Sequence, residues 1–191
     1  MNSYYSEKEL SELGFYSIGK NVLISKKVSV YGVSNIVIGS NVRIDDFCLL
    51  SGKVNIGDYI HIAAYSAFYG GRYGIEIDDF STISSRVVIY AESDDYYGNS
   101  LTNPLIEGKY RTTYGKKIIL GRHTLIGTGC TLLPGAVLPI GNSIGAMSLV
   151  KHELVPWTVY AGIPAKKIGV RSKQVLDLEY AFREEREDNG K

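Results

Sequence analysis

From Ile38 to Phe68 the sequence reads IGSNVRIDDFCLLSGKVNIGDYIHIAAYSAF, with a large apolar residue at every sixth position. The residues in phase are Ile38, Ile44, Leu50, Ile56, Ile62 and Phe68. An α-helix repeats every 3.6 residues and a β-strand every 2, so neither explains this period. A six-residue repeat is typical of a parallel β-helix, in which each hexapeptide forms one short strand and one corner.

The same phase continues on both sides of this stretch. It begins at Ile18, resumes at Ile77, and after a long break runs from Leu120 to Val150. Most residues four positions after a phase residue are small or β-branched, and both cysteines, Cys48 and Cys130, hold such positions. We therefore expect triangular coils about 4.8 Å apart, with the phase residues and both thiols in the interior.

The pattern divides the chain into three parts. Residues 1–17 form an N-terminal helical cap, 18–155 the β-helix with an excursion loop at 95–119, and 156–191 a C-terminal tail and helix. Ser6 and Glu9 have the spacing of a capping box, and Val175, Leu178 and Phe182 lie on one face of a helix from about 172 to 187. Both helices are expected to cover the exposed strand edges at the ends of the β-helix. The fold class is therefore all-β with two short helical additions.

Composition excludes several classes of protein. The chain has 191 residues, and its formal net charge of +1 gives no general affinity for nucleic acid. No apolar run approaches the roughly 20 residues of a membrane span, and the N-terminus lacks a secretory pattern, so we expect a cytoplasmic protein. The three histidines, His61, His123 and His152, fall on different coils and at different phases, so no metal site is expected.

Three segments near the C-terminus resemble a known family. They are IGTGCTLLPGAV at 126–137, IGAMSLV at 144–150 and VYAGIPAKKI at 159–168. This set resembles the acetyl-CoA end of galactoside and maltose acetyltransferases, members of the hexapeptide-repeat acyltransferase family with a left-handed parallel β-helix. The resemblance spans about residues 18–170. It implies a homotrimer with active sites between neighbouring subunits.

The resemblance also implies a donor site for acetyl-CoA. It places Thr128, Ala146, Lys151 and Lys166 on the coenzyme, with the lysines neutralising its phosphates. Glycine and alanine at outward positions would let the pantetheine arm lie close to the backbone. His123 and His152 are expected to support the site or the coenzyme rather than perform chemistry.

On the acceptor side, the family alignment places Tyr65 where galactoside-type enzymes contact the sugar, and Asp95 is a further candidate for substrate binding. The loop Ser93–Pro104 resembles that of transferases that decorate bacterial surface polysaccharides. We therefore expect an acetyl-CoA-dependent O-acetyltransferase of a sugar hydroxyl in O-antigen or capsule biosynthesis, with a sugar or sugar nucleotide as acceptor.

The catalytic base is the point where the chain departs from the family. Asp94 occupies the position of the family's catalytic histidine. Because histidine suits proton transfer at neutral pH, we expect His61, four residues before Tyr65, to act as the base. The trimer of the family would let Asp94 of a neighbouring subunit orient His61. A solvated corner for His61 and a loop-opening turn for Asp94 and Asp95 are the structural alternatives.

Two other functions fit the sequence. The context Ile56-Gly57-Asp58-x-x-His61-Ile62-Ala63 is also found in nucleotide-sugar N-acetyltransferases, so N-acetylation of a nucleotide-linked amino sugar is one alternative. The absence of the family histidine favours the other, a non-catalytic β-helix that serves as a scaffold subunit.

Overall fold

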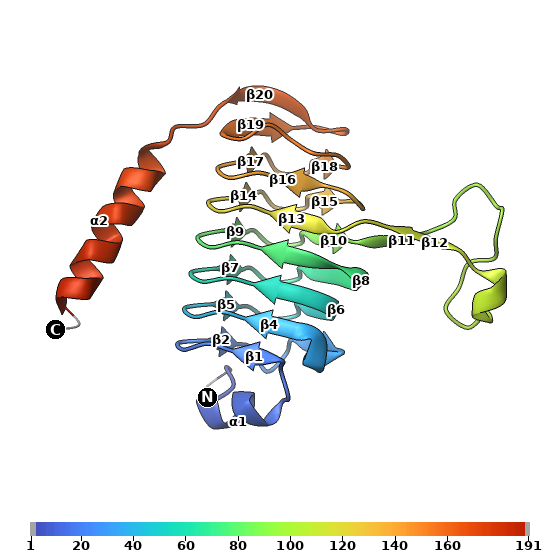
Figure 1. Cartoon of the computed structure of the whole chain (residues 1–191), viewed down its shortest axis with the longest axis horizontal. Coiled ribbons are helices and arrows are strands. Elements are labelled where there is room, and N and C mark those ends of the chain that lie inside the picture. Colours follow the sequence, from blue (N-terminus) through green and yellow to red (C-terminus); the bar gives the residue numbers. More distant parts are fainter. Residues whose placement is uncertain (1–2, 190–191) are drawn as a thin grey trace.

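The hexapeptides fold into short parallel strands that wind around a three-sided prism (Figure 1). The computed structural model describes residues 3–189 of the chain. Successive coils pair in register, so that Ile44 lies over Ile24 and Ile62 over Ile44. The fold is the parallel β-helix expected from the six-residue period, with the left hand implied by the family resemblance.

The strands divide among three faces of the prism. Face one holds β1 (Ser17–Ile18), β4 (Ile36–Ile38), β13 (Ile118–Leu120) and β16 (Val137–Leu138). Face two holds β2 (Leu23–Ile24), β5 (Arg43–Ile44), β7 (His61–Ile62), β9 (Thr82–Ile83), β14 (Leu125–Ile126), β17 (Ser143–Ile144) and β19 (Thr158–Ala161). Face three holds β3 (Ser29–Tyr31), β10 (Val88–Tyr90), β15 (Thr131–Leu132) and β18 (Leu149–Val150). β6 (Leu49–Ile56) and β8 (Ala67–Ile77) bend from face three into face one.

The interior is filled by the predicted phase residues. Ile24, Ile62 and Ile126 are fully buried, and Cys48 and Cys130 lie beside them as expected. Burial raises the pKa of the Cys48 thiol to about 11, so this group stays protonated at neutral pH. One detail differs from the prediction: Ser34, which lies four positions after the phase residue Val30 and was expected to point inward, is exposed, and Ile36 takes the inward place. The reason is that the 3₁₀ turn η1 (Val33–Asn35) absorbs the two extra residues of this coil.

The two ends of the prism are covered in different ways. At the N-terminal end, α1 (Glu7–Glu12) carries the predicted capping box of Ser6 and Glu9 and buries Leu10 against the first coil. At the C-terminal end, β20 (Lys166–Val170) folds back antiparallel to β19. The helix α2 (Gln174–Asn189) does not cover this end, contrary to our expectation. Figure 1 shows α2 running alongside the coils.

Three corners connect the faces, and they organise the site described below. Corner A joins face one to face two and holds Asn21, Asn41, Tyr59, Phe80, His123, Gly141 and Trp157. Corner B joins face two to face three and holds Lys27, Phe47, Tyr65, Arg86, Gly129 and Met147. Corner C joins face three back to face one. The excursion leaves the prism from corner C (Figure 1).

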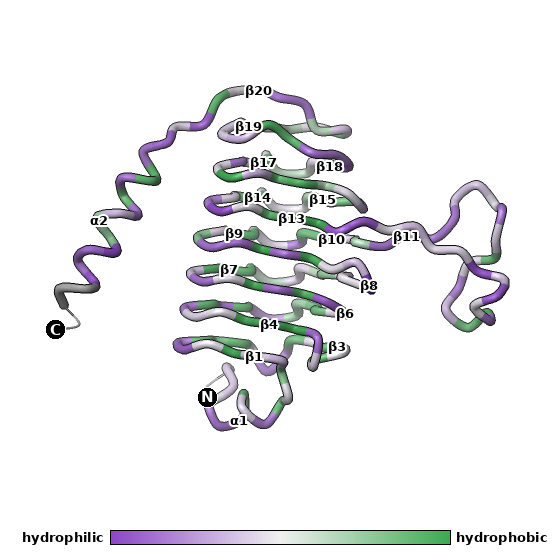
Figure 2. Tube along the Cα trace, viewed as in Figure 1, coloured by the Kyte–Doolittle hydropathy of each residue, from purple (hydrophilic) through white to green (hydrophobic). Residues whose placement is uncertain are grey.

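The excursion is an arm built on an antiparallel pair, β11 (Glu92–Asp94) and β12 (Thr113–Gly115), with a 3₁₀ turn η2 (Gly108–Tyr110) near its tip. It begins three residues before the predicted boundary, because Ala91 is the last fully buried residue before it. Hydrophobic segments recur on every coil, whereas the arm and α2 are mostly hydrophilic or neutral (Figure 2). Among the described residues, no helix has both the length and the apolar character to cross a membrane.

Candidate active site

The donor residues implied by the family resemblance lie on successive coils of corner B. Thr128 and Ala146 are both exposed, and the backbone N–H of Met147 donates to the carbonyl of Thr128 over 2.8 Å. The neighbouring glycine has a structural cause, because a Cβ on Gly127 would lie 2.6 Å from the backbone nitrogen of Ala146. Stacking of the coils alone therefore requires a glycine at 127, and the strip beside Thr128 is lined by small residues together with the exposed side chain of Met147.

Two lysines lie on the C-terminal coils, Lys166 beside this strip and Lys151 at the other edge of face three. Lys166 lies on β20, in register with Ala161 of β19, and Lys151 follows β18. Both lysines are exposed, and neither pairs with a carboxylate among the described residues. Free ammonium groups fit the phosphates of coenzyme A, and the strip fits its extended arm. Binding of the coenzyme by Thr128, Ala146, Lys151 and Lys166 stays a prediction.

The predicted acceptor residue Tyr65 lies on corner B toward the N-terminal end. Its ring stacks on Phe47 of the preceding coil, with ring centroids 5.0 Å apart. Tyr65 is 56% exposed and Phe47 50%. A stacked aromatic pair with one open surface is suited to receive a planar or apolar ring of a ligand.

The predicted base His61 has a carboxylate partner within its own chain. Its Nε2 lies 2.8 Å from Oδ2 of Asp45, and the Nε–H of Arg43 donates to Oδ1 of Asp45 over 2.7 Å. Burial alone would raise the pKa of Asp45, but the hydrogen bonds from His61 and Arg43 outweigh burial and lower it. Asp45 is therefore an ionised group that fixes the half-exposed imidazole.

Sequence reasoning did not identify Asp45 as this partner. The available signal for this contact was the coil register. Arg43 pairs with His61 on the neighbouring strand, and Asp45 follows two residues after Arg43. We had expected Asp94 to hold His61 from a neighbouring subunit. Within one chain, Asp94 lies on the arm and faces Arg111, whose guanidinium is 3.9 Å from its carboxylate, and the pairing with His61 across subunits stays a prediction.

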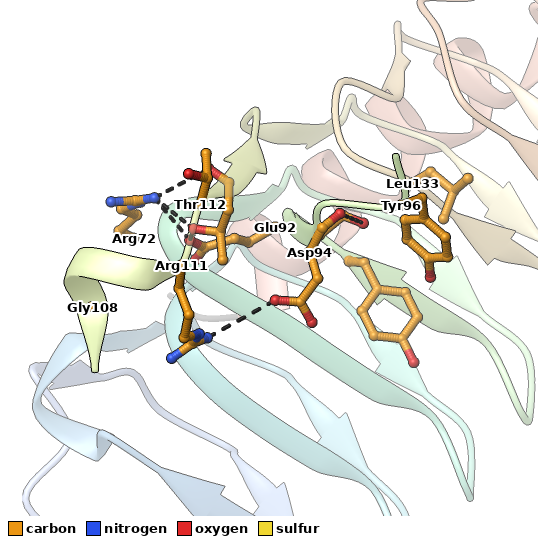
Figure 3. A pocket seen from close by; sticks show the side chains of 11 residues that line it. Arg72, Glu92, Asp94, Tyr96, Gly108, Arg111, Thr112 and Leu133 are labelled. Carbon is orange, nitrogen blue, oxygen red and sulfur yellow. Dashed lines mark hydrogen bonds and ion pairs between the residues drawn. The ribbon is translucent and has the colours of Figure 1, made fainter. Parts of the chain in front are cut away.

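A polar cleft of about 820 Å³ surrounds Asp94 at the base of the arm. Figure 3 shows Arg111 reaching toward Asp94, while Arg72 points toward Glu92 and Thr113. The charges of the two arginines in this cleft are therefore offset by carboxylates. The open part of the cleft lies toward Tyr96 and Leu133.

Asp95 has a role in building the arm. Its carboxylate accepts the backbone N–H groups of Tyr97, Asn99 and Ser100, at 2.9, 2.6 and 2.9 Å. These bonds, led by the one from Tyr97, lower the pKa of Asp95. The side chain is buried and its oxygens are occupied, as in the turn alternative considered above. Substrate binding by Asp95 stays a prediction.

His123 serves the C-terminal helix rather than the strip. Its ring is buried on corner A, and its Nε2 lies 2.8 Å from Oε2 of Glu179 on α2. Arg122 and Arg183 share the other oxygen of Glu179. No group of three or more metal-ligating side chains occurs among the side chains that the structure describes.

Comparison with known proteins identifies relatives over almost the whole chain. Models of protein families give no match. A curated relative from Escherichia coli, dTDP-4-amino-4,6-dideoxy-D-glucose acyltransferase, is 46% identical over 184 residues, covering 95% of each chain.

Solved structures of AntD, an N-acyltransferase from Bacillus cereus, share the fold closely. In complex with dTDP and 3-hydroxybutyryl-CoA, AntD matches with a TM-score of 0.95 and 50% identity, covering 98% of this chain and 100% of AntD. The S84A mutant of AntD, in complex with dTDP-4-amino-4,6-dideoxyglucose and coenzyme A, matches with a TM-score of 0.93 and 49% identity over 97% and 100% of the two chains. The D94A mutant, with dTDP and coenzyme A, has a TM-score of 0.94 at 50% identity and covers 97% and 100%.

Proposed function

The chain belongs to the hexapeptide-repeat acyltransferase family, and we propose that it acylates the amino group of a dTDP-linked 4-amino-4,6-dideoxy sugar. Its relatives are acyltransferases that act on sugars and use acyl-CoA, and this chain is such an enzyme. The finer proposal is supported above all by 46% identity to a dTDP-amino-sugar acyltransferase over 95% of both chains. The scaffold alternative has no support from these relatives.

This proposal changes the expected acceptor atom from oxygen to nitrogen. Sequence analysis favoured transfer to a sugar hydroxyl and kept N-acylation of a nucleotide-linked amino sugar as an alternative. The relatives favour that alternative, since AntD is an N-acyltransferase and its S84A mutant was solved with the amino sugar nucleotide. Nothing in the hexapeptide repeat distinguishes the two acceptors, because both reactions use the same coenzyme and the same fold.

The proposed acceptor site includes two further residues of this chain. It has a serine at 84 and an aspartate at 94, the residue types and numbers substituted in AntD. Ser84 lies at corner B, where its backbone N–H donates to Ile126 of the next coil over 2.9 Å. It therefore lies on the strip between the His61 coil and the donor residue Thr128.

We assign His61 and Asp45 to proton removal from the acceptor nitrogen. Asp45 holds the imidazole through Nε2 over 2.8 Å, so the other ring nitrogen, Nδ1, is the one available to a substrate. Acyl-CoA supplies an activated thioester when bound. Thr128, Ala146 and Lys166 would orient it, and Asp94 would contact the amino group. Direct transfer needs no enzyme nucleophile, and both cysteines are buried.

A site that contains both Ser84 and Asp94 requires two subunits. Ser84 precedes β10 at corner B, whereas Asp94 follows β10 beyond corner C, so face three separates them. The arm beyond Asp94 exposes Tyr96, Tyr97 and Leu105 at 89%, 93% and 91%. We propose that this arm packs on a neighbouring copy in a homotrimer. Light scattering at micromolar concentration should give three times the chain mass, and a stable monomer would contradict the proposal.

The acceptor is tested by a matched pair of substrates. Acetyl-CoA is incubated with dTDP-4-amino-4,6-dideoxyglucose or with dTDP-6-deoxyglucose, which has a hydroxyl in place of the amino group. We expect release of CoA and an alkali-stable amide with the first substrate and at most slow turnover with the second. If the second substrate gave an alkali-labile ester at a rate equal to or higher than that of amide formation, O-acylation would be the better assignment.

A further inference from the structure

Arg86 is the arginine of the described chain whose guanidinium has no partner. Arg43, Arg72, Arg111, Arg122 and Arg183 pair with carboxylates, Arg171 donates to the carbonyls of His123 and Asn142, and Arg186 donates to Tyr59. Arg86 is exposed on corner B, and only its backbone N–H forms a hydrogen bond, to the carbonyl of Ala64. An unpaired guanidinium at the corner that carries the proposed acceptor site is available to bind an anion.

The neighbours of Arg86 along corner B are aromatic. Tyr65 occupies the equivalent position one coil earlier, about 4.8 Å away along the prism axis, and Phe47 stacks beneath Tyr65. On the other side the corner residue is Gly129, which has no side chain of its own, and the thioether of Met147 lies over its backbone. Corner B therefore presents an open aromatic surface followed directly by a free cation.

This order fits one chemical class of ligand. A pyrimidine nucleoside diphosphate carries a planar ring at one end and a doubly charged group at the other. The planar fork of arginine binds phosphate oxygens through two parallel hydrogen bonds, and an aromatic surface stacks with a base. The cleft at the base of the arm is a poorer match, because Arg72 and Arg111 there already face Glu92 and Asp94.

We propose that Arg86 binds the diphosphate of the sugar nucleotide while the base stacks on Tyr65, since the ring of Phe47 lies between Tyr65 and the ammonium group of Lys27. This inference rests on the proposed function and identifies a nucleotide subsite within it. The sugar would then lie beside Ser84 and Ser85, at the same turn of the same coil and next to the donor strip.

The experiment measures binding of dTDP and of acetyl-CoA, in separate titrations, to the full-length protein and its Arg86→Ala variant. We expect Arg86→Ala to weaken dTDP binding about 10- to 100-fold, the range for a lost charge-assisted bidentate contact, and to leave acetyl-CoA binding unchanged. Arg86→Lys should recover part of the affinity, because lysine keeps the charge but lacks the fork. Arg186→Ala, which removes an exposed arginine from corner A, is the matched control and should bind dTDP normally.

A second ligand separates the two ends of the subsite. Thymidine lacks phosphates, so its weaker binding should be unaffected by Arg86→Ala and reduced by Tyr65→Ala. If dTDP binds the unmodified protein and Arg86→Ala equally well, the proposed role of Arg86 is wrong while the proposed function stands. If the unmodified protein binds acetyl-CoA but no dTDP, the proposed function itself fails.

Discussion

Corners A and B of the prism are built by the same repeat and differ in what covers them. Corner A carries Tyr59, Phe80 and His123 beneath helix α2, where Phe182 meets Tyr59 edge to face at 5.4 Å. The side chains of His123, Arg122 and Arg183 converge on the buried carboxylate of Glu179. Corner B carries Phe47, Tyr65 and Arg86 open to solvent, and Arg86 has no partner among the described residues. Similar side chains thus stabilise the molecule at one corner and are free to bind a ligand at the other.

This difference shows that residue type alone does not decide the role of a side chain on this fold. His123 and His61 both contact a carboxylate at 2.8 Å. His123 is buried under a helix, whereas His61 is half-exposed on face two, beside corner B. A histidine can exchange protons with a substrate only where the substrate can reach it. The following predictions test whether the two corners are as separate as the structure indicates.

The largest effect is expected at corner A. Glu179→Ala leaves His123, Arg122 and Arg183 without their shared acceptor, which should cost about 3 kcal/mol. The loss should appear as detachment of α2, measured by faster amide hydrogen exchange over residues 174–186, with acyl transfer retained. Glu184→Ala removes an exposed carboxylate from the same helix and should change exchange little. If detachment of α2 also abolished acyl transfer, corners A and B would be coupled.

On face two, beside corner B, His61→Ala should lower kcat by about 10²-fold, the lower end for general base catalysis, because an amine is less demanding than a hydroxyl. The half-exposed ring fills no core volume, so the melting temperature and acetyl-CoA binding should be preserved. Asp45→Asn should lower kcat less, since it leaves the imidazole in place but removes the charge that orients it. If Asp94→Asn costs more than His61→Ala, the base lies on the arm and our assignment is wrong.

A smaller effect is expected at the donor end. Lys166→Ala should raise the KM for acetyl-CoA about 5-fold with kcat nearly unchanged, because an exposed phosphate contact acts equally on ground and transition states. The increase should shrink in high salt. Lys20→Ala, at the opposite end of the prism, provides the control. A fall in kcat at constant KM would place Lys166 near the thioester instead of the coenzyme tail.

The smallest effect concerns pH at corner A. Burial, followed by the charges of Arg122, Arg171 and Arg183, lowers the pKa of His123. The unfolded chain therefore binds a proton on His123 more readily than the folded chain does. The stability that depends on neutral His123 is complete above about pH 6.5 and is lost as the pH falls toward the pKa of His123 in the folded state. The change cannot exceed about 1.4 kcal/mol per pH unit. Thermal melts from pH 7 to 5 should decline less steeply for His123→Gln, and identical slopes would contradict this.

Much of this arrangement could be predicted from the sequence, because a strict period leaves few choices. Ile24, Ile62 and Ile126 could be assigned to the core since each hexapeptide repeats one strand and one corner. The capping box of Ser6 and Glu9 depends only on local spacing and formed as predicted. The course of α2 could not be predicted, because its apolar face specifies burial without specifying the partner surface.

The sequence by itself determined the prism, its interior and the strip of small residues that holds the donor positions, since these follow from a six-residue period and from steric limits between stacked coils. Only the tertiary structure decided that His61 meets Asp45, that His123 belongs to α2, and that Arg86 is left unpaired. The physical reason is that a periodic pattern fixes which side chains point outward, whereas partners between outward side chains depend on which coils, helix and arm approach each corner in space.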